Sequence, residues 1–394
     1  MNDDLTDLLP AHSLLGASSA HRWLACPGSF NLCRRAPPSR PSVHAARGTL
    51  AHALIEEALQ TRAQRIDKLL DTQVQIDGYD LVVDDEMIEG VHIMLDYVNQ
   101  ARGDYEQVMS ETLVQLDKCF TGQRPPPVLM FGRTDVLMLS LARRALEIVD
   151  FKNGAGVTVE PEMNPQELYY AAGVLCMLPD NAVHQVKLTV VQPHVRHRDK
   201  VRSSVIDVID LWMWIEDVLL PGVRAAEASD AALVPGFYCR FCPASLMCSA
   251  LHDAAVAMAK HEFSDDALSL PETPDKLADA LDLAARAETW IEAVRAHAIE
   301  QLKSQVRIPH WGLVPTRPTR KWRSETEVTG TLRSLLEDTD VFATTLRSPA
   351  QLEKIVRRKL GNDTWDVLSQ TQVLSVSSGV KLQRDGQDLA EEEF

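Results

Sequence analysis

The stretch Gly132–Lys152 constrains the fold of this chain more than any other. Two apolar runs rich in Val, Ile and Leu flank a polar break at residues 140–144, a pattern typical of a β-hairpin. Asp135 and Asp150 lie nearly equidistant from the middle of this break. In a symmetric hairpin they would face each other, with Cβ atoms about 4.5–5.5 Å apart. Two carboxylates at that distance repel unless a cation lies between them.

Lys152 follows Asp150 by two residues, so on a strand both side chains point to the same face. Two acids and a lysine on one face of an apolar hairpin predict a site where a divalent metal supports hydrolysis. The alternative is an exposed ion pair between Asp150 and Lys152 at a strand end, because an Asp-x-Lys tripeptide is common by chance.

Helical and strand patterns alternate along the chain around this hairpin. Helical spacing covers residues 46–64, 84–101 and 205–226, and strand character covers residues 106–117 and 184–192. Asn164 followed by Pro165 is typical of a helix start. This alternation favours a mixed central sheet flanked by helices, an α/β layered fold.

Composition and length are those of a globular protein with two domains. The chain has 394 residues, of which 45% are hydrophobic and 24% charged. An acidic, proline-containing stretch predicts a boundary between residues 1–262 and a mainly helical extension, residues 263–394, with an acidic tail. No run approaches the roughly 20 apolar residues that span a bilayer. The N-terminal stretch lacks the features of a secretion signal. We therefore expect a soluble, cytoplasmic protein.

The net charge of −16 argues against a wholly basic nucleic-acid coat protein. It still allows an enzyme with a local basic groove.

Three of the seven cysteines, Cys239, Cys242 and Cys248, fall within ten residues. Closely spaced thiolates of this kind suit zinc or an iron–sulfur cluster, and both commonly take four thiolates. Cys26, in a turn before Pro-Gly, is the best candidate for the fourth ligand, and Cys33 is its rival. The alternative is that these cysteines bind nothing. The odd cysteine count does not suggest a disulfide scaffold.

The ordered set of motifs resembles a known family. The set comprises Cys26, His52 in Gly-Thr-Leu-Ala-His, Glu111, Gly132-x-x-Asp135, Asp150-x-Lys152, Gln166-x-x-x-Tyr170 and Cys239-x2-Cys242-x5-Cys248. Its order and spacing resemble the RecB-like branch of the PD-(D/E)XK nucleases. The likeness is to the iron–sulfur members, such as the AddB nuclease domain, and most of all to phage- and prophage-encoded proteins. It covers roughly residues 12–255.

The resemblance implies a restriction-endonuclease-like core in residues 1–262 and a metal site within it. His52, Asp135 and Asp150 would bind Mg²⁺ or Mn²⁺, together with the backbone carbonyl of Phe151. Glu111 would lie behind these ligands without binding the metal itself.

The resemblance also implies roles for the remaining motif residues. Lys152 would position or deprotonate the attacking water and hold the phosphate, while Gln166 and Tyr170 would support the lysine and contact the DNA backbone. A structural 4Fe–4S cluster would clip the two ends of the nuclease domain together, with zinc as the alternative. Its ligands would be Cys26, Cys239, Cys242 and Cys248.

The function implied is that of a metal-dependent deoxyribonuclease, expected to act as an exonuclease on linear single- or double-stranded DNA. It would process DNA ends in phage recombination or replication inside a bacterial host cell, beside a phage single-strand annealing or binding protein. The alternative is a catalytically silent nucleic-acid-binding or adaptor protein with a structural four-cysteine metal site.

Overall fold

The structure is a computed structural model. It describes residues 13–37, 41–120, 130–154, 157–262, 273–315, 319–322, 325–341, 346–376 and 380–384. The expected acidic tail, residues 385–394, lies outside the described residues. The chain forms two compact units, Met1–Trp290 and Ile291–Phe394. The predicted boundary after residue 262 adjoins residues 263–272, which are also outside the described part, and it stays a prediction.

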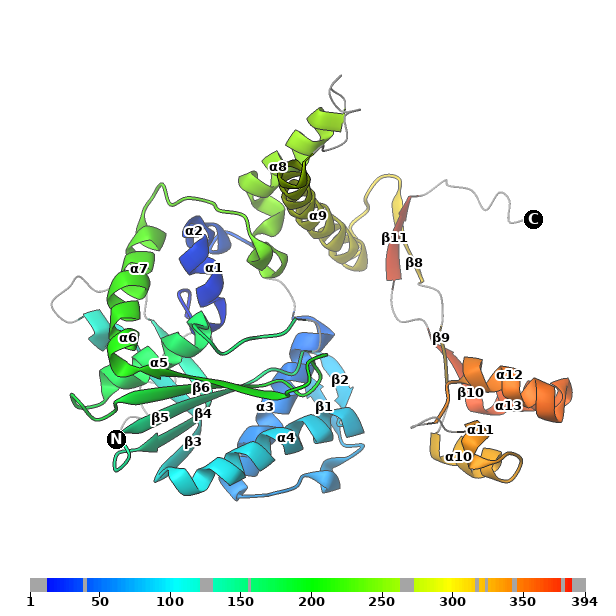
Figure 1. Cartoon of the computed structure of the whole chain (residues 1–394). Coiled ribbons are helices and arrows are strands. Elements are labelled where there is room, and N and C mark those ends of the chain that lie inside the picture. The colour runs from blue at the N-terminus through cyan, green and yellow to red at the C-terminus, as the bar shows by residue number, and fades with distance from the viewer. Residues whose placement is uncertain are drawn as a thin grey trace. The chain divides into compact units, whose positions relative to one another are not determined.

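A five-stranded mixed sheet forms the centre of the first unit (Figure 1). Its strands, in spatial order, are β3 (Gln107–Gln115), β4 (Phe131–Ser140), β5 (Ala145–Phe151), β6 (Gln185–Val191) and β7 (Val201–Asp207). β5 and β6 run parallel, and the other neighbours are antiparallel. The β4–β5 pair is the predicted symmetric hairpin, with Ser140 opposite Ala145 and Val136 opposite Val149.

Helices cover both faces of this sheet (Figure 1). One side carries α1 (Ala20–Ala25), α2 (Gly28–Cys33), α5 (Pro165–Met177), α6 (Val208–Trp214) and α7 (Leu220–Glu227). The other side carries α3 (Val43–Thr61), α4 (Asp85–Ala101) and the hairpin β1 (Gln73–Ile76)–β2 (Tyr79–Val82). The layered α/β arrangement predicted from the alternating patterns is therefore present.

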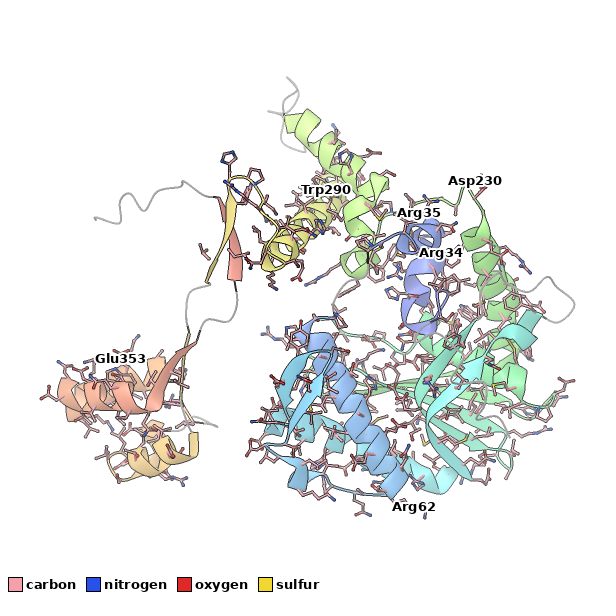
Figure 2. The ribbon with its side chains drawn as sticks, turned by 180° about the vertical axis from the view of Figure 1, so that it is seen from behind. Arg34, Arg35, Arg62, Asp230, Trp290 and Glu353 are labelled. Atoms are coloured by element: carbon pink, nitrogen blue, oxygen red, sulfur yellow. A yellow bond between two sulfur atoms is a disulfide. The ribbon has the colours of Figure 1, made fainter. Side chains whose placement is uncertain are left out.

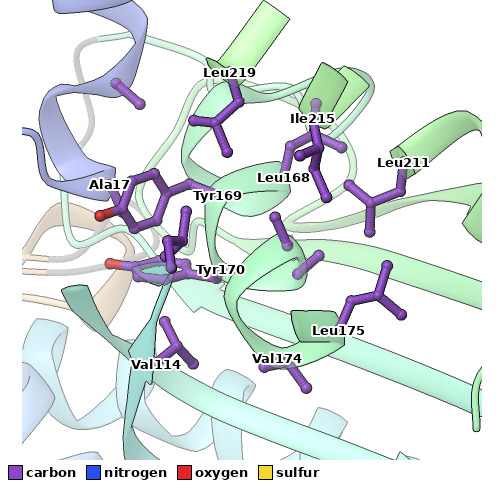
Figure 3. Packing of buried hydrophobic residues seen from close by; sticks show 14 of the residues in the cluster. Ala17, Val114, Leu168, Tyr169, Tyr170, Val174, Leu175, Leu211, Ile215 and Leu219 are labelled. Carbon is purple, nitrogen blue, oxygen red and sulfur yellow. The ribbon is translucent and has the colours of Figure 1, made fainter. Parts of the chain in front are cut away.

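Side-chain alternation along the central strands divides the core between these two layers. On β4, Leu137 and Leu139 belong to the cluster packed under α5, whereas Val136 and Met138 belong to the cluster under α3 and α4. Tyr169 and Ile215 lie in the α5 cluster (Figure 3). Each helix layer is therefore held by its own apolar face of the sheet.

Asn164 caps α5 as predicted. Its side-chain oxygen accepts a hydrogen bond from the backbone N–H of Gln166 at 3.0 Å, and Pro165 is the first helical residue. This cap fixes the start of the helix that crosses from β5 to the parallel strand β6.

The helix predicted for residues 205–226 is wrong at its start. Val205 belongs to β7, which pairs with β6 along its length, and the helix begins only at Val208. A π-helical turn, Ile215–Leu219, then joins α6 to α7. Strand β7 forms because it satisfies the backbone groups of β6, a non-local requirement that a local helical pattern does not reveal.

Cys119 and Cys176 form a disulfide that the cysteine count did not predict. They are 57 residues apart, and the packing of α5 against the 3-10 helix Asp117–Phe120 brings them together.

The first unit continues through α8 (Ser249–Glu262) into α9 (Pro274–Lys303), which also enters the second unit. Trp290 of α9 lies edge-on to His252 of α8, with ring centroids 5.5 Å apart (Figure 2). Among the described residues, none of the helices combines the length and the apolar character that crossing a bilayer requires.

The second unit contains helices and four short strands among its described residues. Its further helices are α10 (Glu325–Arg333), α11 (Asp338–Val341), α12 (Pro349–Leu360) and α13 (Asn362–Gln372). Its strands form two antiparallel pairs, β8 (Trp311–Pro315) with β11 (Val380–Arg384) and β9 (Thr319–Trp322) with β10 (Val373–Val376). Trp322 and Trp365 pack edge to face in its core.

The contact between α5 and β3 predicts the effect of adding a methyl group at Gly173. A Cβ there would lie 2.9 Å from Val114 Cβ, so the helix must shift away from the sheet. We expect Gly173→Ala to lower the free energy of unfolding by about 1–3 kcal/mol. Gly48→Ala in α3 is the matched control, because its Cβ would meet no atom within 4 Å, and it should stabilise by up to about 1 kcal/mol. Thermal unfolding followed by far-UV circular dichroism measures both. Equal melting temperatures for the two variants would contradict this packing.

Candidate active site

Three carboxylates lie side by side on three neighbouring strands. On β3, the residues before and after Glu111 pair with Val136 and Thr134 of β4. Glu111 therefore lies opposite Asp135. On β5, Asp150 follows Val149, the partner of Val136, and so lies next to Asp135. The two aspartates therefore face each other as the hairpin symmetry predicted.

Glu111 has a backbone conformation that a strand residue rarely adopts. Its φ is +45°, in the left-handed region that disfavours residues with a Cβ. Val108 packs with the α3–α4 cluster and Val114 with the α5 cluster, although a regular strand would keep both on one face. The change of face occurs around Glu111. Strain of this kind persists where the surroundings hold it, often at functional sites.

His52 reaches the carboxylates from α3. Its Nδ1 lies 3.3 Å from Asp135 Oδ1, and its ring stands edge-on to Phe151, with centroids 5.7 Å apart. The other oxygen, Asp135 Oδ2, accepts a hydrogen bond from the backbone N–H of Phe151 at 2.6 Å. The ligand atoms of His52, Glu111 and Asp135 all lie within 4.8 Å of one another. Glu111 is therefore as close to this group as the predicted ligands, whereas Asp150 is not part of it.

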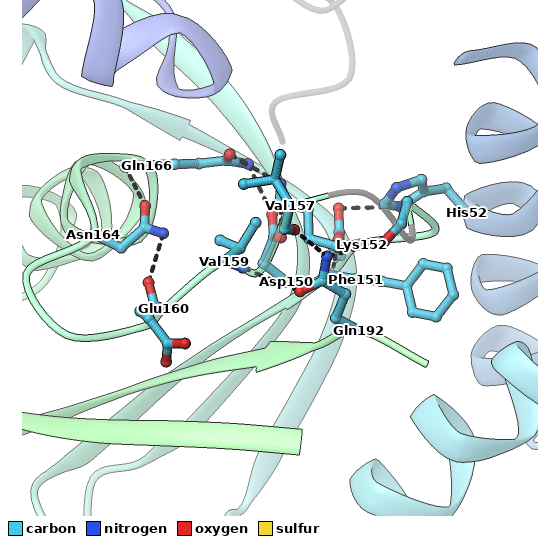
Figure 4. A network of polar contacts seen from close by, with 12 residues as sticks. His52, Asp150, Phe151, Lys152, Val157, Val159, Glu160, Asn164, Gln166 and Gln192 are labelled. Carbon is cyan, nitrogen blue, oxygen red and sulfur yellow. Dashed lines mark hydrogen bonds and ion pairs between the residues drawn. The ribbon is translucent and has the colours of Figure 1, made fainter. Parts of the chain in front are cut away.

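Asp150, Lys152 and Gln166 form a closed triangle of polar contacts (Figure 4). Lys152 Nζ lies 2.8 Å from Asp150 Oδ2 and donates to Gln166 Oε1 at 2.9 Å. The amide Nε2 of Gln166 donates to Asp150 Oδ1 at 2.8 Å. The pairing of Gln166 with the lysine, expected from the family resemblance, is therefore present in the geometry.

Tyr170 forms a wall of the same site, one helical turn after Gln166. The ring is almost fully buried, and a Cβ on Gly132 would lie 2.8 Å from its Cε1 atom. Gly132 is therefore required by the close approach of α5 to β4. Glu167 is fully buried, and neither of its carboxyl oxygens has a hydrogen-bond partner among the described residues.

Burial and mutual charge shift the ionisation of the site. Burial lowers the pKa of His52, but the neighbouring Asp135 carboxylate outweighs it and the pKa rises to about 9. Burial raises the pKa of Asp150 to about 6 against the opposing effect of Lys152, and it raises the pKa of Glu111 to about 7. The pKa of Lys152 also rises, because Asp150 and Asp135 more than offset its burial. Lys152 is therefore held in its charged form.

These side chains converge on one pocket of about 620 Å³. The pocket is lined by the predicted site residues together with Glu111, namely His52, Glu111, Asp135, Asp150, Lys152, Gln166 and Tyr170. Phe151 contributes its backbone N–H to Asp135, and it also lines a second pocket that shares His52 and Lys152 with the first. An acid in the middle of a strand pattern was the only sequence signal for Glu111.

The cysteines converge on a separate pocket, which the four predicted ligands line together: Cys26, Cys239, Cys242 and Cys248. The backbone N–H groups of Val234 and Gly236 donate to the sulfurs of Cys26 and Cys239, each at 3.3 Å. Cys33, the rival ligand, has its sulfur 3.7 Å from that of Cys242. Five cysteines from the two ends of the first unit therefore meet here.

The contact between His52 and Asp135 predicts a change in titration. In metal-free Asp135→Asn the pKa of His52 should fall from about 9 to near or below 6.5, because burial then dominates. A raised histidine pKa contributes stability below pH 6.5 that is lost as the pH rises through about 9. The stability deficit of Asp135→Asn should therefore shrink over that range. Histidine NMR titration measures the pKa, and His52→Gln assigns the signal. An unchanged titration would rule out the pairing.

A comparison with protein families adds one finding. A family model described as "Protein of unknown function (DUF2800)" matches residues 12–378, a span that includes both the carboxylate pocket and the cysteine pocket. Because the match covers most of the chain, this protein belongs to the DUF2800 family.

Proposed function

We propose that this protein is a divalent-metal-dependent deoxyribonuclease of the RecB-like PD-(D/E)XK type, acting as an exonuclease on linear DNA. The observation that carries the proposal is the row of Glu111, Asp135 and Asp150 on adjacent strands, with Lys152 bound to the last of them. The mixed sheet, in which α5 links β5 to the parallel β6, supports a restriction-endonuclease-like core. Phage recombination or replication is the setting we propose for end processing.

The donor set fits Mg²⁺ or Mn²⁺. Carboxylate oxygens with one imidazole suit these hard cations, and the ligand atoms of His52, Glu111 and Asp135 are already grouped. We propose these three residues as ligands, with Asp150 completing the site from the neighbouring strand. When bound, the cation would lower the pKa of a water molecule and offset the negative charge on the phosphate.

Lys152 acts in this proposal as a fixed positive charge. In the metal-free site Asp150 and Asp135 raise the pKa of Lys152, and we propose that its ammonium group donates a hydrogen bond to a phosphate oxygen. The position of Nζ is set by Asp150 on one side and Gln166 on the other.

Gln166 is a positioning residue, because it contacts both members of the ion pair at once. Its own position follows from the Asn164 cap and the first turn of α5. Tyr170 shapes the adjoining wall, where the absence of a side chain at Gly132 leaves room for its ring.

We propose that Cys26, Cys239, Cys242 and Cys248 hold a structural 4Fe–4S cluster. Tetrahedral zinc, with Zn–S near 2.3 Å, would hold its thiolate sulfurs about 3.8 Å apart. Within the described residues, no three cysteine sulfurs form a group that close. The two N–H···S hydrogen bonds would stabilise thiolate ligands in either kind of centre. The Cys33–Cys242 pair, at 3.7 Å, keeps Cys33 as the rival ligand.

Removal of the Asp150 charge tests the nuclease. Asp150→Asn should lower the rate of Mn²⁺- or Mg²⁺-dependent cleavage of end-labelled linear DNA by about 100-fold or more, because a proposed metal ligand that also holds Lys152 loses its charge. Lys152→Met should do the same. Asp210→Asn, an exposed aspartate in α6, is the matched control and should cleave like the wild type.

Circular DNA, included as a second substrate, separates exonuclease from endonuclease action. Wild-type protein with its cysteine site intact that leaves all these substrates uncut would refute the nuclease and favour a binding or adaptor role.

Single cysteine variants test the second centre. After purification without oxygen, Cys242→Ser should lose bound iron and sulfide and the brown colour, whereas Cys33→Ser should retain them, because three ligands hold a cluster poorly. Elemental analysis for iron and zinc and visible absorbance give the readout. Loss of iron in Cys33→Ser with retention in Cys26→Ser would transfer the fourth ligand to Cys33. Stoichiometric zinc without iron would refute the cluster.

A further inference from the structure

A second pocket, of about 840 Å³, adjoins the candidate active site and shares His52 and Lys152 with it. Its lining is rich in basic side chains, namely His44, Arg47, His52, Lys152, His194 and Arg240. Glu86 is the acid among the described residues that line it, and it lies 3.8 Å from Arg47 and 3.7 Å from His194. In a chain with a net charge of −16, this concentration of basic groups matches a polyanion.

The cysteine segment places an exposed aromatic ring at this pocket. Phe241 is 62% exposed, lines the pocket, and has the guanidinium of Arg240 5.7 Å from its ring centroid. Large apolar side chains are usually buried, so an exposed ring beside a basic pocket calls for an explanation. Phe237, at the other end of the same 3-10 helix, is 81% exposed but does not line the pocket. It stacks instead on His21.

The α3 side of the pocket leaves room for a bound molecule to approach the helix backbone closely. Gly48 lines it, and a Cβ at this position would meet no atom within 4 Å. Of the two arginines, Arg47 is already held by Asp84 at 2.9 Å, whereas Arg240 has no carboxylate partner within the described residues. Lys152 is likewise paired with Asp150 at 2.8 Å, so Arg240 is the cation in this pocket best able to take a phosphate group.

Building on the proposed function, we infer that this pocket binds a nucleotide of single-stranded DNA adjoining the scissile phosphate, with its base stacked on Phe241. Base stacking on aromatic rings and a basic groove along the backbone are the two features by which proteins hold single strands. The face of a base inside a duplex is covered by its neighbours, so this contact requires an unstacked strand. His52 and Lys152, which line both pockets, would then lie between the carboxylates and this nucleotide's binding site.

The cysteine centre positions this stacking residue. Phe241 and Arg240 lie between Cys239 and Cys242, and the backbone N–H of Cys242 donates to the carbonyl of Cys239 at 3.0 Å. Arg22 of α1 adds a contact to the Phe241 carbonyl at 3.4 Å. The segment that presents the ring is thus fixed by the same cysteines that are proposed to bind the cluster.

Binding to a single strand tests the inference independently of cleavage. Wild-type protein, Phe241→Ala and the matched control Phe237→Ala are titrated, without divalent metal, into a labelled oligonucleotide containing 2-aminopurine. Phe241→Ala should weaken binding by about tenfold or more and abolish the fluorescence change that reports stacking. Phe237→Ala should bind within about twofold of the wild type. Phe241→Trp should restore both binding and the signal, which excludes a simple folding defect.

The outcomes separate this inference from the proposed nuclease. Wild-type protein that binds and stacks the strand but cuts no DNA would refute the nuclease and leave the binding pocket standing. Wild-type protein that cuts DNA, with Phe241→Ala and Phe237→Ala binding alike, would overturn the pocket and leave the nuclease standing. Equal affinity of the wild type for single strands and blunt duplexes would also overturn it.

Discussion

Repulsion between carboxylates is the constraint on which the rest of this structure depends. Asp135 and Asp150 face each other across the hairpin, with Glu111 beside them, and all three are withdrawn from bulk water. Their charge is compensated from both helix layers. His52 comes from α3 on one side, and Gln166 comes from α5 on the other, where it holds Lys152 in place. The helices on both faces of the sheet therefore also supply the side chains that compensate the charge of the carboxylates.

The parts of the site that depend on local sequence patterns were predictable from the sequence. Symmetric spacing about a polar break fixed the register that pairs the two aspartates, and the Asn164 cap fixed the start of α5. Glu111 could not be assigned in the same way, because its left-handed backbone and its approach to His52 arise from tertiary packing. β7 was missed for a related reason, since pairing with β6 outweighed a locally helical pattern.

For the cysteine centre, the sequence spacing predicted a binding segment, and the fold shows which other cysteines lie beside it. Cys239-x2-Cys242-x5-Cys248 predicted a metal-binding segment, and α1 and α2 bring Cys26 and Cys33 to it. The two ends of the first unit meet at these sulfurs. Since residues between Cys239 and Cys242 line the basic pocket, loss of the centre is expected to disturb binding of a substrate as well as stability.

The net charge of −16 is reconciled with a polyanionic substrate by the way charge is distributed around Lys152. The carboxylates line one pocket and repel a phosphate unless a cation is bound, whereas Arg240 and its basic neighbours line the adjoining pocket and attract it. A strand entering from the basic side therefore meets a favourable potential until it reaches Lys152. Its further progress depends on the charge state of the carboxylates. In the proposed nuclease, binding of the cation and binding of the strand would therefore be coupled through Coulomb interactions, without any change in fold.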